Sequence, residues 1–262
     1  MAGAVPGIFA RRRVVAMCEV CGVVSRRAFC GGALALTMGR AALAGGRPPG
    51  LLEPGLRVKG TGGGRTVAVS LDACPGWFDR RIADVLVAKA IPATIFVTAV
   101  WMRWNPEGLA YFLARPDIFT LENHGARHLP PVLGDARVYG LAPAGTVEAI
   151  RAEVLDGAAA VEKVTGRRPQ WYRGAAGLYS PAAIPVIEAL GFKVAGYSLN
   201  SDQGASLPPE IVARRLEAAK DGDVTEGHIN QPRRASGAGI AEGLAALQAA
   251  GARFVGFETA YG

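Results

Sequence analysis

The chain has 262 residues, half of them hydrophobic, which is enough for one large domain or two small ones and argues against disorder. The formal net charge of +7 would by itself suit a nucleic-acid or membrane partner. Residues 1–44 hold six arginines and one glutamate, whereas residues 45–262 hold 23 basic and 21 acidic residues. The body of the chain is therefore nearly neutral, and it has no basic run with interleaved aromatic residues that would indicate nucleic-acid binding.

The N-terminal segment is typical of an export signal. The stretch SRRAFC (25–30) resembles a twin-arginine motif, and a short apolar run and the small residues AALAGG follow it, with cleavage expected after Ala44. The run is too short to span a bilayer. We therefore expect residues 1–44 to be a twin-arginine signal peptide, with Met1 or Met17 as the start, and the mature protein to be exported, periplasmic or secreted, with no stable membrane span. A disordered tail or an internal amphipathic helix is the alternative.

The cysteines divide in the same way. Cys18, Cys21 and Cys30 lie in the predicted signal, and the CxxC formed by the first two has no second pair that would indicate a metal site. The mature chain keeps only Cys74, so it can form no internal disulfide.

Beyond the signal, strands and helices alternate regularly. Residues 45–64 are rich in Gly and Pro and are interpreted as a linker or an irregular leading segment before a domain spanning residues 65–262. Ser180 is expected to cap a helix that has Pro181 at its first position. The hydrophobic patterns predict strands over residues 65–72, 93–98, 117–123, 170–173, 193–199, 223–229 and 253–259, and helices over residues 78–90, 104–116, 146–166, 180–191, 208–222 and 238–251.

About seven β-α units of this kind imply parallel strands joined by right-handed crossovers. They fit an open doubly wound sheet or a barrel, and in both the chemistry lies at the C-terminal ends of the strands. No GxGxxG follows the first strand, which argues against a dinucleotide-binding fold.

All three histidines of the chain fall at these strand ends. His124 and His128 are four residues apart and could bind one metal ion if their loop forms a helical turn, because neutral imidazoles are good zinc ligands. Two surface or hydrogen-bonded histidines are the alternative. Six chemically capable side chains lie at the strand ends: Asp72, His124, His128, Arg173, Asp202 and His228.

From Thr66 to Gly256 this set of motifs resembles the polysaccharide deacetylases, carbohydrate esterase family four, which include chitooligosaccharide and peptidoglycan deacetylases. The family's motif Thr-Phe-Asp-Asp-Gly-Pro is SLDACP (70–75) here, and its His-x-x-x-His motif is NHGARH (123–128). RGAAG (173–177) stands for Arg-Pro-Pro-Tyr-Gly, DQ (202–203) for Asp-Trp, and GH (227–228) for the final histidine motif. The resemblance implies a distorted seven-stranded (β/α) barrel.

The resemblance also implies a divalent metal, with zinc expected, bound by an Asp-His-His triad. His124 and His128 match the two histidines, but the metal-binding Asp is replaced by Ala73. Water, substrate or another residue could complete the metal sphere, Asp72 could move to bind the metal, or the site could be degenerate. Cys74 takes the position of the family's Gly, and we expect a small packed residue there rather than a ligand. The retention of the other site residues favours the first interpretation.

The activity implied is that of a hydrolase that removes N-acetyl groups from an amino-sugar polymer or oligosaccharide. Asp72 would act as the base on a metal-activated water, and His228 as the acid toward the leaving amine. Arg173 and Asp202 would orient Asp72 and His228, and the backbone N–H of Ala176 would stabilise the oxyanion.

The substrate expected is an N-acetylated glycan. Aromatic residues that follow strand ends could stack on sugar rings or could equally be core residues: Trp77, Trp101, Trp104 and Tyr179. Two other functions stay open. One is a catalytically silent saccharide-binding protein of the envelope, and the other is a metal-dependent amidase for a non-sugar amide, since RGAAG could reshape the pocket. The sequence does not indicate an oligomeric state.

Overall fold

The computed structural model describes residues 49–60, 62–257 and 260–261, so the predicted signal peptide and its three cysteines lie outside the described residues. Within the described residues, all strands join one sheet. They are β1 (Arg57–Val58), β2 (Thr66–Ala73), β3 (Ala93–Val97), β4 (Phe119–Asn123), β5 (Trp171–Tyr172), β6 (Lys193–Val194), β7 (Leu199–Asn200), β8 (Asp223–Glu226), β9 (Arg253–Val255) and β10 (Ala260–Tyr261).

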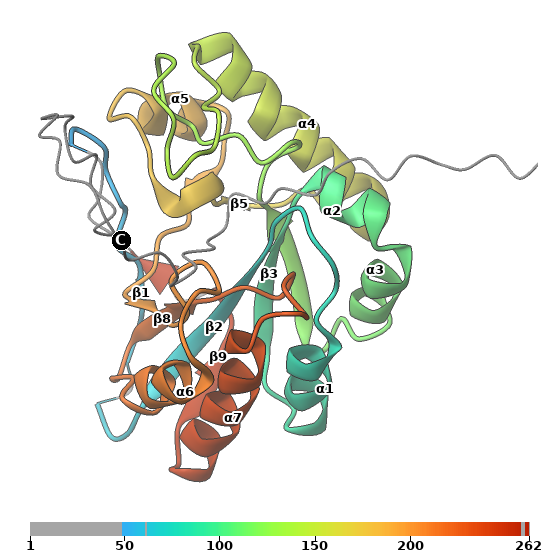
Figure 1. The fold of residues 1–262 in the computed structure, drawn as a ribbon, viewed down its shortest axis with the longest axis vertical. Coiled ribbons are helices and arrows are strands. Elements are labelled where there is room, and N and C mark those ends of the chain that lie inside the picture. The colour runs from blue at the N-terminus through green and yellow to red at the C-terminus, as the bar shows by residue number, and fades with distance from the viewer. Residues whose placement is uncertain (1–48, 61, 258–259, 262) are drawn as a thin grey trace, which may run out of the picture.

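The sheet is curled and its main path runs β10-β1-β8-β2-β3-β4-β5-β6, while β7 pairs with β8 and β9 with β2 (Figure 1). The pairings among β2 to β9 are parallel, and β1 pairs antiparallel with both β8 and β10. This architecture confirms the predicted distorted (β/α) barrel. The carboxyl ends of the parallel strands therefore meet at one end of the sheet.

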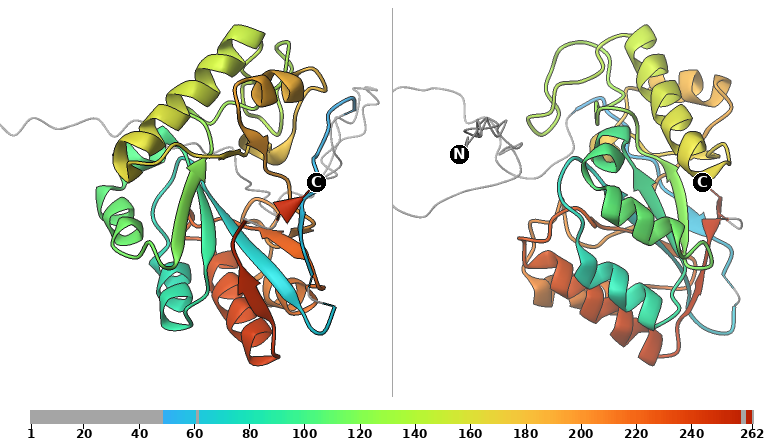
Figure 2. Two further views of the ribbon diagram at one scale, coloured as in Figure 1. Left: turned by 180° about the vertical axis from the view of Figure 1, so that it is seen from behind. Right: turned by 90° about the vertical axis from the view of Figure 1, so that its right-hand side faces the viewer.

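The helices pack around the outside of the sheet (Figure 2). α6 lies against α7 and α7 against α1, while α2 contacts α3 and α4, and α4 contacts α5. None of the described helices is long and apolar enough to cross a bilayer. The bounds are α1 (Arg80–Ala88), α2 (Ala99–Trp104), α3 (Pro106–Leu113), α4 (Val147–Thr165), α5 (Ala183–Ala189), α6 (Pro209–Glu217) and α7 (Ser236–Ala249), with a 3-10 turn η1 (Ala175–Gly177).

The side chains of β2 alternate between the two faces of the sheet. Val69, Leu71 and Ala73 belong to the largest hydrophobic cluster, which fills the space between the sheet and the helices. Because successive side chains of a strand point to opposite faces, Ser70 and Asp72 point to the inner, concave side. Ala73, at the position where the polysaccharide deacetylases carry a metal-binding carboxylate, is thus a core residue here.

Residues 56–58, within the Gly- and Pro-rich segment, pack against the folded domain. Leu56 and Val58 are buried, and the N–H of Val58 donates to the carbonyl of Gly222 at 3.0 Å. The same segment divides the strand predicted over residues 193–199, because the backbone of Pro54 and Leu56 exchanges hydrogen bonds with Tyr197. The result is two short strands, β6 and β7, in place of one.

Two details of the predicted helices are wrong. Ser180 does not cap α5, which begins at Ala183, and its Oγ instead accepts the N–H of Leu133 at 2.9 Å. The short helix α2 was not predicted, although Thr98 caps it in the usual way by accepting the N–H of Trp101 at 3.0 Å.

Candidate active site

Arg173, just after β5, forms hydrogen bonds with several residues on the inner face of the sheet. Its side chain is fully buried, and Nη1 donates to Asp72 Oδ1 at 2.8 Å. Nη2 donates to Ser70 Oγ at 2.8 Å and to the carbonyl of Gly196 at 3.0 Å. The guanidinium also lies over the Phe96 ring, 4.2 Å from its centroid. Asp72 and Arg173 are therefore in the contact that the sequence analysis expected, while their catalytic roles stay predictions.

Asp72 is held as a carboxylate. It is only 5% exposed, and this burial alone would raise its pKa. The positive charges of Arg173, His124 and His228 outweigh the burial and hold the pKa of Asp72 below its ordinary value. The group is thus ionised at neutral pH and can accept a proton from a reacting molecule.

His124, directly after β4, presents one ring nitrogen to the site. Its Nδ1 lies 2.8 Å from the carbonyl of Arg173, so in the neutral ring Nδ1 carries the proton and Nε2 is the free base. Nε2 lies 3.4 Å from Cys74 Sγ and 3.7 Å from Asp72 Oδ2. Burial lowers the pKa of His124, but the charges of Asp72 and Cys74 raise it to about 9, so a metal ion would compete with a proton for Nε2.

His128 lies beside His124, but the backbone conformation that brings the two together differs from the predicted helical turn. Residues 124–128 form no helical turn; Gly125 (φ +87°) and His128 (φ +69°) both adopt left-handed conformations. The ring centroids of His124 and His128 are nevertheless 5.0 Å apart. The Nε2 atom of His128 is buried and has no hydrogen-bond partner among the described residues. A buried polar atom without a partner is costly, which indicates that a ligand belongs there.

Glu153 of α4 holds this loop in place. Its Oε1 accepts the N–H groups of Arg127 and His128, each at 2.8 Å, and of Leu129 at 3.2 Å. A Cβ on Gly125 would lie 2.5 Å from the same oxygen, so only glycine fits at that position. The sequence analysis missed Glu153; an acid within the buried stripe of an amphipathic helix was the available signal.

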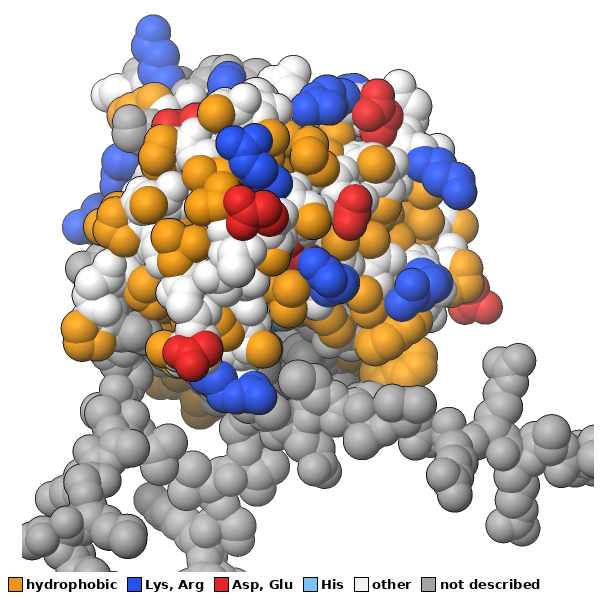
Figure 3. Space-filling view, turned by 90° about the horizontal axis from the view of Figure 1, so that it is seen from above, with side chains coloured by type: hydrophobic (Ala, Val, Ile, Leu, Met, Phe, Trp, Pro, Cys, Tyr) orange, Lys and Arg blue, Asp and Glu red, His pale blue; other side chains and the backbone are white. Residues whose placement is uncertain are grey.

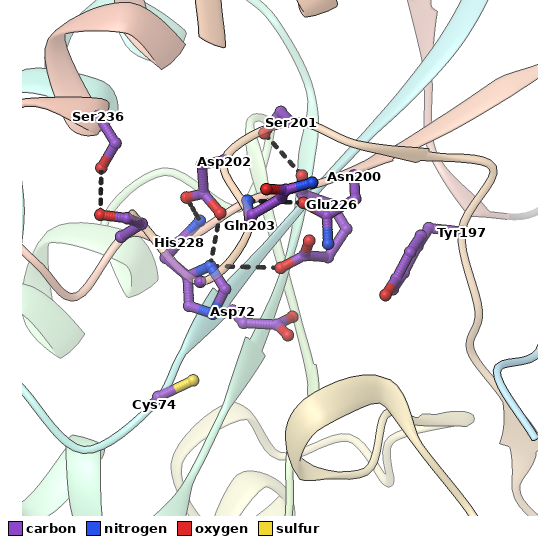
Figure 4. Close-up of polar contacts among 12 residues, drawn as sticks. Asp72, Cys74, Tyr197, Asn200, Ser201, Asp202, Gln203, Glu226, His228 and Ser236 are labelled. Atoms are coloured by element: carbon purple, nitrogen blue, oxygen red, sulfur yellow. Dashed lines mark hydrogen bonds and ion pairs between the residues drawn. The ribbon is translucent and has the colours of Figure 1, made fainter. Parts of the chain in front are cut away.

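His228 lies after β8, between two carboxylates (Figure 4). Its Nδ1 is 2.9 Å from Asp202 Oδ1 and 3.3 Å from Glu226 Oε1, and its backbone N–H donates to Asp202 Oδ2 at 2.8 Å. Burial lowers the pKa of His228, but Asp202 and Glu226 raise it well above the ordinary value. The ring is 17% exposed, whereas Asp202 is fully buried, so His228 is the member of the pair that solvent or substrate can reach.

Glu226 is a second group that the sequence analysis missed. It is 3% exposed, and its Oε2 has no hydrogen-bond partner among the described residues. Burial raises the pKa of Glu226, and the negative charges of Asp202 and Asp72 raise it further. The positive charge of His228 opposes this rise, and the resulting pKa is about 8. Its signal was an acid inside a buried strand, two residues before the histidine.

Two groups of three side chains in the described residues are close enough to hold a metal ion, with ligand atoms within 4.8 Å of one another: Cys74, His124 and His128, and Asp72, Glu226 and His228. The first group fits zinc, since it combines two imidazoles with a thiol and includes the unpartnered Nε2 of His128. Burial raises the pKa of Cys74, but His128 and His124 hold it well below the ordinary value. Cys74 Sγ lies 3.4 Å from His124 Nε2, a contact that was not predicted from the sequence.

Two of the four aromatic residues that could stack on a sugar or belong to the core are core residues. Trp101 is fully buried and stacks on Phe112, with 5.6 Å between the ring centroids. Tyr179 is also fully buried, and its hydroxyl accepts the N–H of Gly174 at 2.7 Å. Neither ring has a face that a sugar can reach. Trp77 and Trp104 are 46% and 48% exposed, and their stacking stays a prediction.

Ala176 lies in the loop that follows Arg173. Its backbone is left-handed, with φ +64° and ψ 0°. Non-glycine residues adopt this conformation rarely, and such residues cluster at functional sites. The role of its N–H in stabilising an oxyanion stays a prediction.

The chain belongs to the polysaccharide deacetylase family, whose model matches residues 59–195, more than half of the chain. None of the curated proteins matches it. Solved structures with the same fold include the peptidoglycan deacetylase PdaC from Bacillus subtilis, at 21% identity and a TM-score of 0.59, covering 74% of this chain and 88% of that one. Bacillus subtilis PdaA, a family 4 carbohydrate esterase, is 17% identical with a TM-score of 0.59, covering 76% and 81%.

Similar structures also include a carbohydrate esterase family 4 pseudoenzyme from Bacillus anthracis. It is 15% identical, with a TM-score of 0.58, and the match covers 73% of this chain and 63% of that one. The fold is therefore compatible with active and inactive members, and the side chains of the site must decide between them.

Replacement of Glu153 by alanine tests the cradle of the histidine loop. Three backbone N–H groups would lose their acceptor, so we expect the free energy of unfolding to fall by about 2–4 kcal/mol in urea titrations. Glu162→Ala removes an exposed glutamate from the same helix and should change stability little. Equal stability of the two variants would contradict the role given to Glu153.

Proposed function

We propose that this protein is a metal-dependent hydrolase that removes N-acetyl groups from an amino-sugar polymer or oligosaccharide. The observation that carries the proposal is the position of Asp72 between two functional groups. On one side its Oδ2 lies 3.7 Å from the Nε2 of His124. On the other side it lies with Glu226 and His228 in a group whose ligand atoms are within 4.8 Å of one another. An ionised base, two imidazoles for a metal and a carboxylate-paired histidine therefore share one end of the sheet.

His124 and His128 would hold the metal, and zinc suits two imidazoles. When bound, such an ion polarises the amide carbonyl and lowers the pKa of a water molecule. Asp72 would accept a proton from the attacking water, and Arg173 would keep that carboxylate ionised and fixed in position.

His228 would donate a proton to the leaving amine. Its elevated pKa keeps the ring protonated, and its partial exposure lets the ring reach a bound substrate. Asp202 would fix the ring through Nδ1, which leaves Nε2 as the donating atom. The backbone N–H of Ala176 would add a hydrogen bond to the developing oxyanion.

An N-acetylated glycan as substrate is supported by the family, which acts on acetylated glycans. Trp77 and Trp104 are the exposed aromatic residues that would stack on sugar rings. On the face shown in Figure 3, Lys and Arg side chains are scattered among acidic and hydrophobic ones rather than gathered in a basic patch, which agrees with a glycan rather than a nucleic-acid partner. We place this activity outside the cytoplasm, in line with the predicted export signal and with peptidoglycan deacetylases of the same fold.

A catalytically silent saccharide-binding protein is the second candidate. The observation that favours it is Ala73, whose methyl group packs in the core and cannot bind a metal. An inactive protein of the same fold is known in Bacillus anthracis. The two candidates differ in whether acetate is released, because a binding protein would retain an N-acetylated oligomer unchanged.

Removal of the metal tests the proposed activity directly. We expect the full chain to release acetate from N-acetylglucosamine oligomers, to lose this activity on treatment with a chelator, and to regain it when zinc is added back. Small non-sugar amides serve as the comparison substrate. Binding of the oligomers without acetate release, in the presence of saturating zinc, would favour the silent protein.

The variant Asp72→Asn tests the base. An amide cannot accept the proton, so the rate of acetate release should fall by about 100-fold or more. Arg173 would lose its buried counter-charge, so the rate is measured on protein that circular dichroism shows to be folded. Asp156→Asn changes an exposed carboxyl on α4 and is the matched control. Full activity in the Asp72 variant would exclude this residue as the base.

A further inference from the structure

We propose that Cys74 is the third protein ligand of the metal, so that Cys74, His124 and His128 bind the ion together. This inference rests on the proposed function, which requires a metal at His124 and His128. It assigns a thiolate to the role that the family's motif gives to a carboxylate at the position of Ala73.

The register of β2 explains the exchange. Ala73 points to the helix side of the sheet, where it joins Leu71 in the core. Cys74 directly follows the last residue of β2, and its Sγ lies 3.4 Å from His124 Nε2, so its side chain is on the side of the histidines. Compared with the family's motif, the anionic ligand is thus shifted by one residue. Position 73 carries a side chain that packs in the core, and position 74 carries one that faces the histidines.

The distances agree with a shared ion. In a tetrahedral zinc site, with Zn–S about 2.3 Å and Zn–N about 2.1 Å, a sulfur and a nitrogen ligand lie about 3.6 Å apart. Cys74 Sγ and His124 Nε2 are 3.4 Å apart. A ring nitrogen of His128 lies within 4.8 Å of both atoms. The side chains need only small rotations to bind one ion.

The surroundings of the three side chains also suit a metal. The Nδ1 of His124 is hydrogen-bonded to the carbonyl of Arg173. A histidine that binds metal through Nε2 commonly donates its Nδ1 proton to a backbone carbonyl of this kind. His128 has a buried Nε2 with no partner among the described residues. Cys74 is 8% exposed, so the thiol is sheltered while one side of the cluster still borders Asp72.

The rival group of Asp72, Glu226 and His228 is less suitable. The guanidinium of Arg173 lies 2.8 Å from Asp72 and would repel a cation. The ring nitrogen of His228 that faces Glu226 is Nδ1, at 3.3 Å, and this atom is already paired with Asp202 at 2.9 Å. The thiolate group keeps the charge that the family's carboxylate supplies, and two imidazoles with one anionic side chain leave a fourth position open, as in catalytic zinc sites.

Cobalt(II) substitution tests the ligand without relying on activity. The full chain with Cys18, Cys21 and Cys30 replaced by serine has Cys74 as its only thiol. We expect its cobalt form to show a thiolate-to-cobalt charge-transfer band in the near ultraviolet. The band should disappear in the further variant Cys74→Ser, and zinc affinity should fall by more than about 100-fold, since the loss of an outer partner alone costs 10–100-fold.

Glu226→Gln is the matched control, because it removes a ligand of the rival group. It should keep the band and about one metal per chain. One bound metal without the charge-transfer band, or an unchanged zinc affinity in Cys74→Ser, would overturn the assignment of Cys74 and leave the proposed function intact. No bound metal at saturating zinc in any of these proteins would overturn both. The charge-transfer band is measured on protein that retains Cys74. Its presence or absence there does not depend on whether the Cys74→Ser variant folds.

Discussion

The buried Arg173 is the residue on which the rest of the site depends. Its guanidinium binds Asp72 and Ser70 on β2, and its own carbonyl accepts the Nδ1 proton of His124 after β4. One residue thereby fixes the charge state of Asp72 and the orientation of the His124 ring. A buried cation is stable only when its surroundings compensate it, and the carboxylate of Asp72 and the carbonyl of Gly196 do so here. The geometry of the site and the stability of the domain thus both depend on Arg173.

Around Arg173, the chain provides a separate support for each reactive group. Glu153 binds the backbone of the loop that carries His128, and Asp202 binds both the ring and the backbone N–H of His228. Each support comes from a residue 25 or 26 positions away in the chain, so it links two separate elements of the fold. The departures from the family's motifs leave these supports in place, and Cys74 lies where the missing carboxylate would have supplied charge.

The sequence predicted the barrel and the strand ends well, because buried parallel strands have a strong hydrophobic pattern and their carboxyl ends meet. Asp72, His124 and Arg173 were predicted together for that reason. The contact of Cys74 with His124 was not predicted, because the direction of Cys74 depends on how the chain leaves β2, which no local pattern encodes. Trp101 was ambiguous, since an aromatic residue after a strand suits a core or a binding surface equally. The two-residue strand β1 is too short to show a period, so its pairing could not be predicted.

We propose that this end of the sheet holds a metal ion that serves amide hydrolysis. The most direct measurement is an anomalous-difference map of zinc-loaded crystals, with data collected on both sides of the zinc absorption edge. We expect one strong peak within bonding distance of His124 and His128. A map with no peak there, or with its only peak among Asp72, Glu226 and His228, would contradict this proposal.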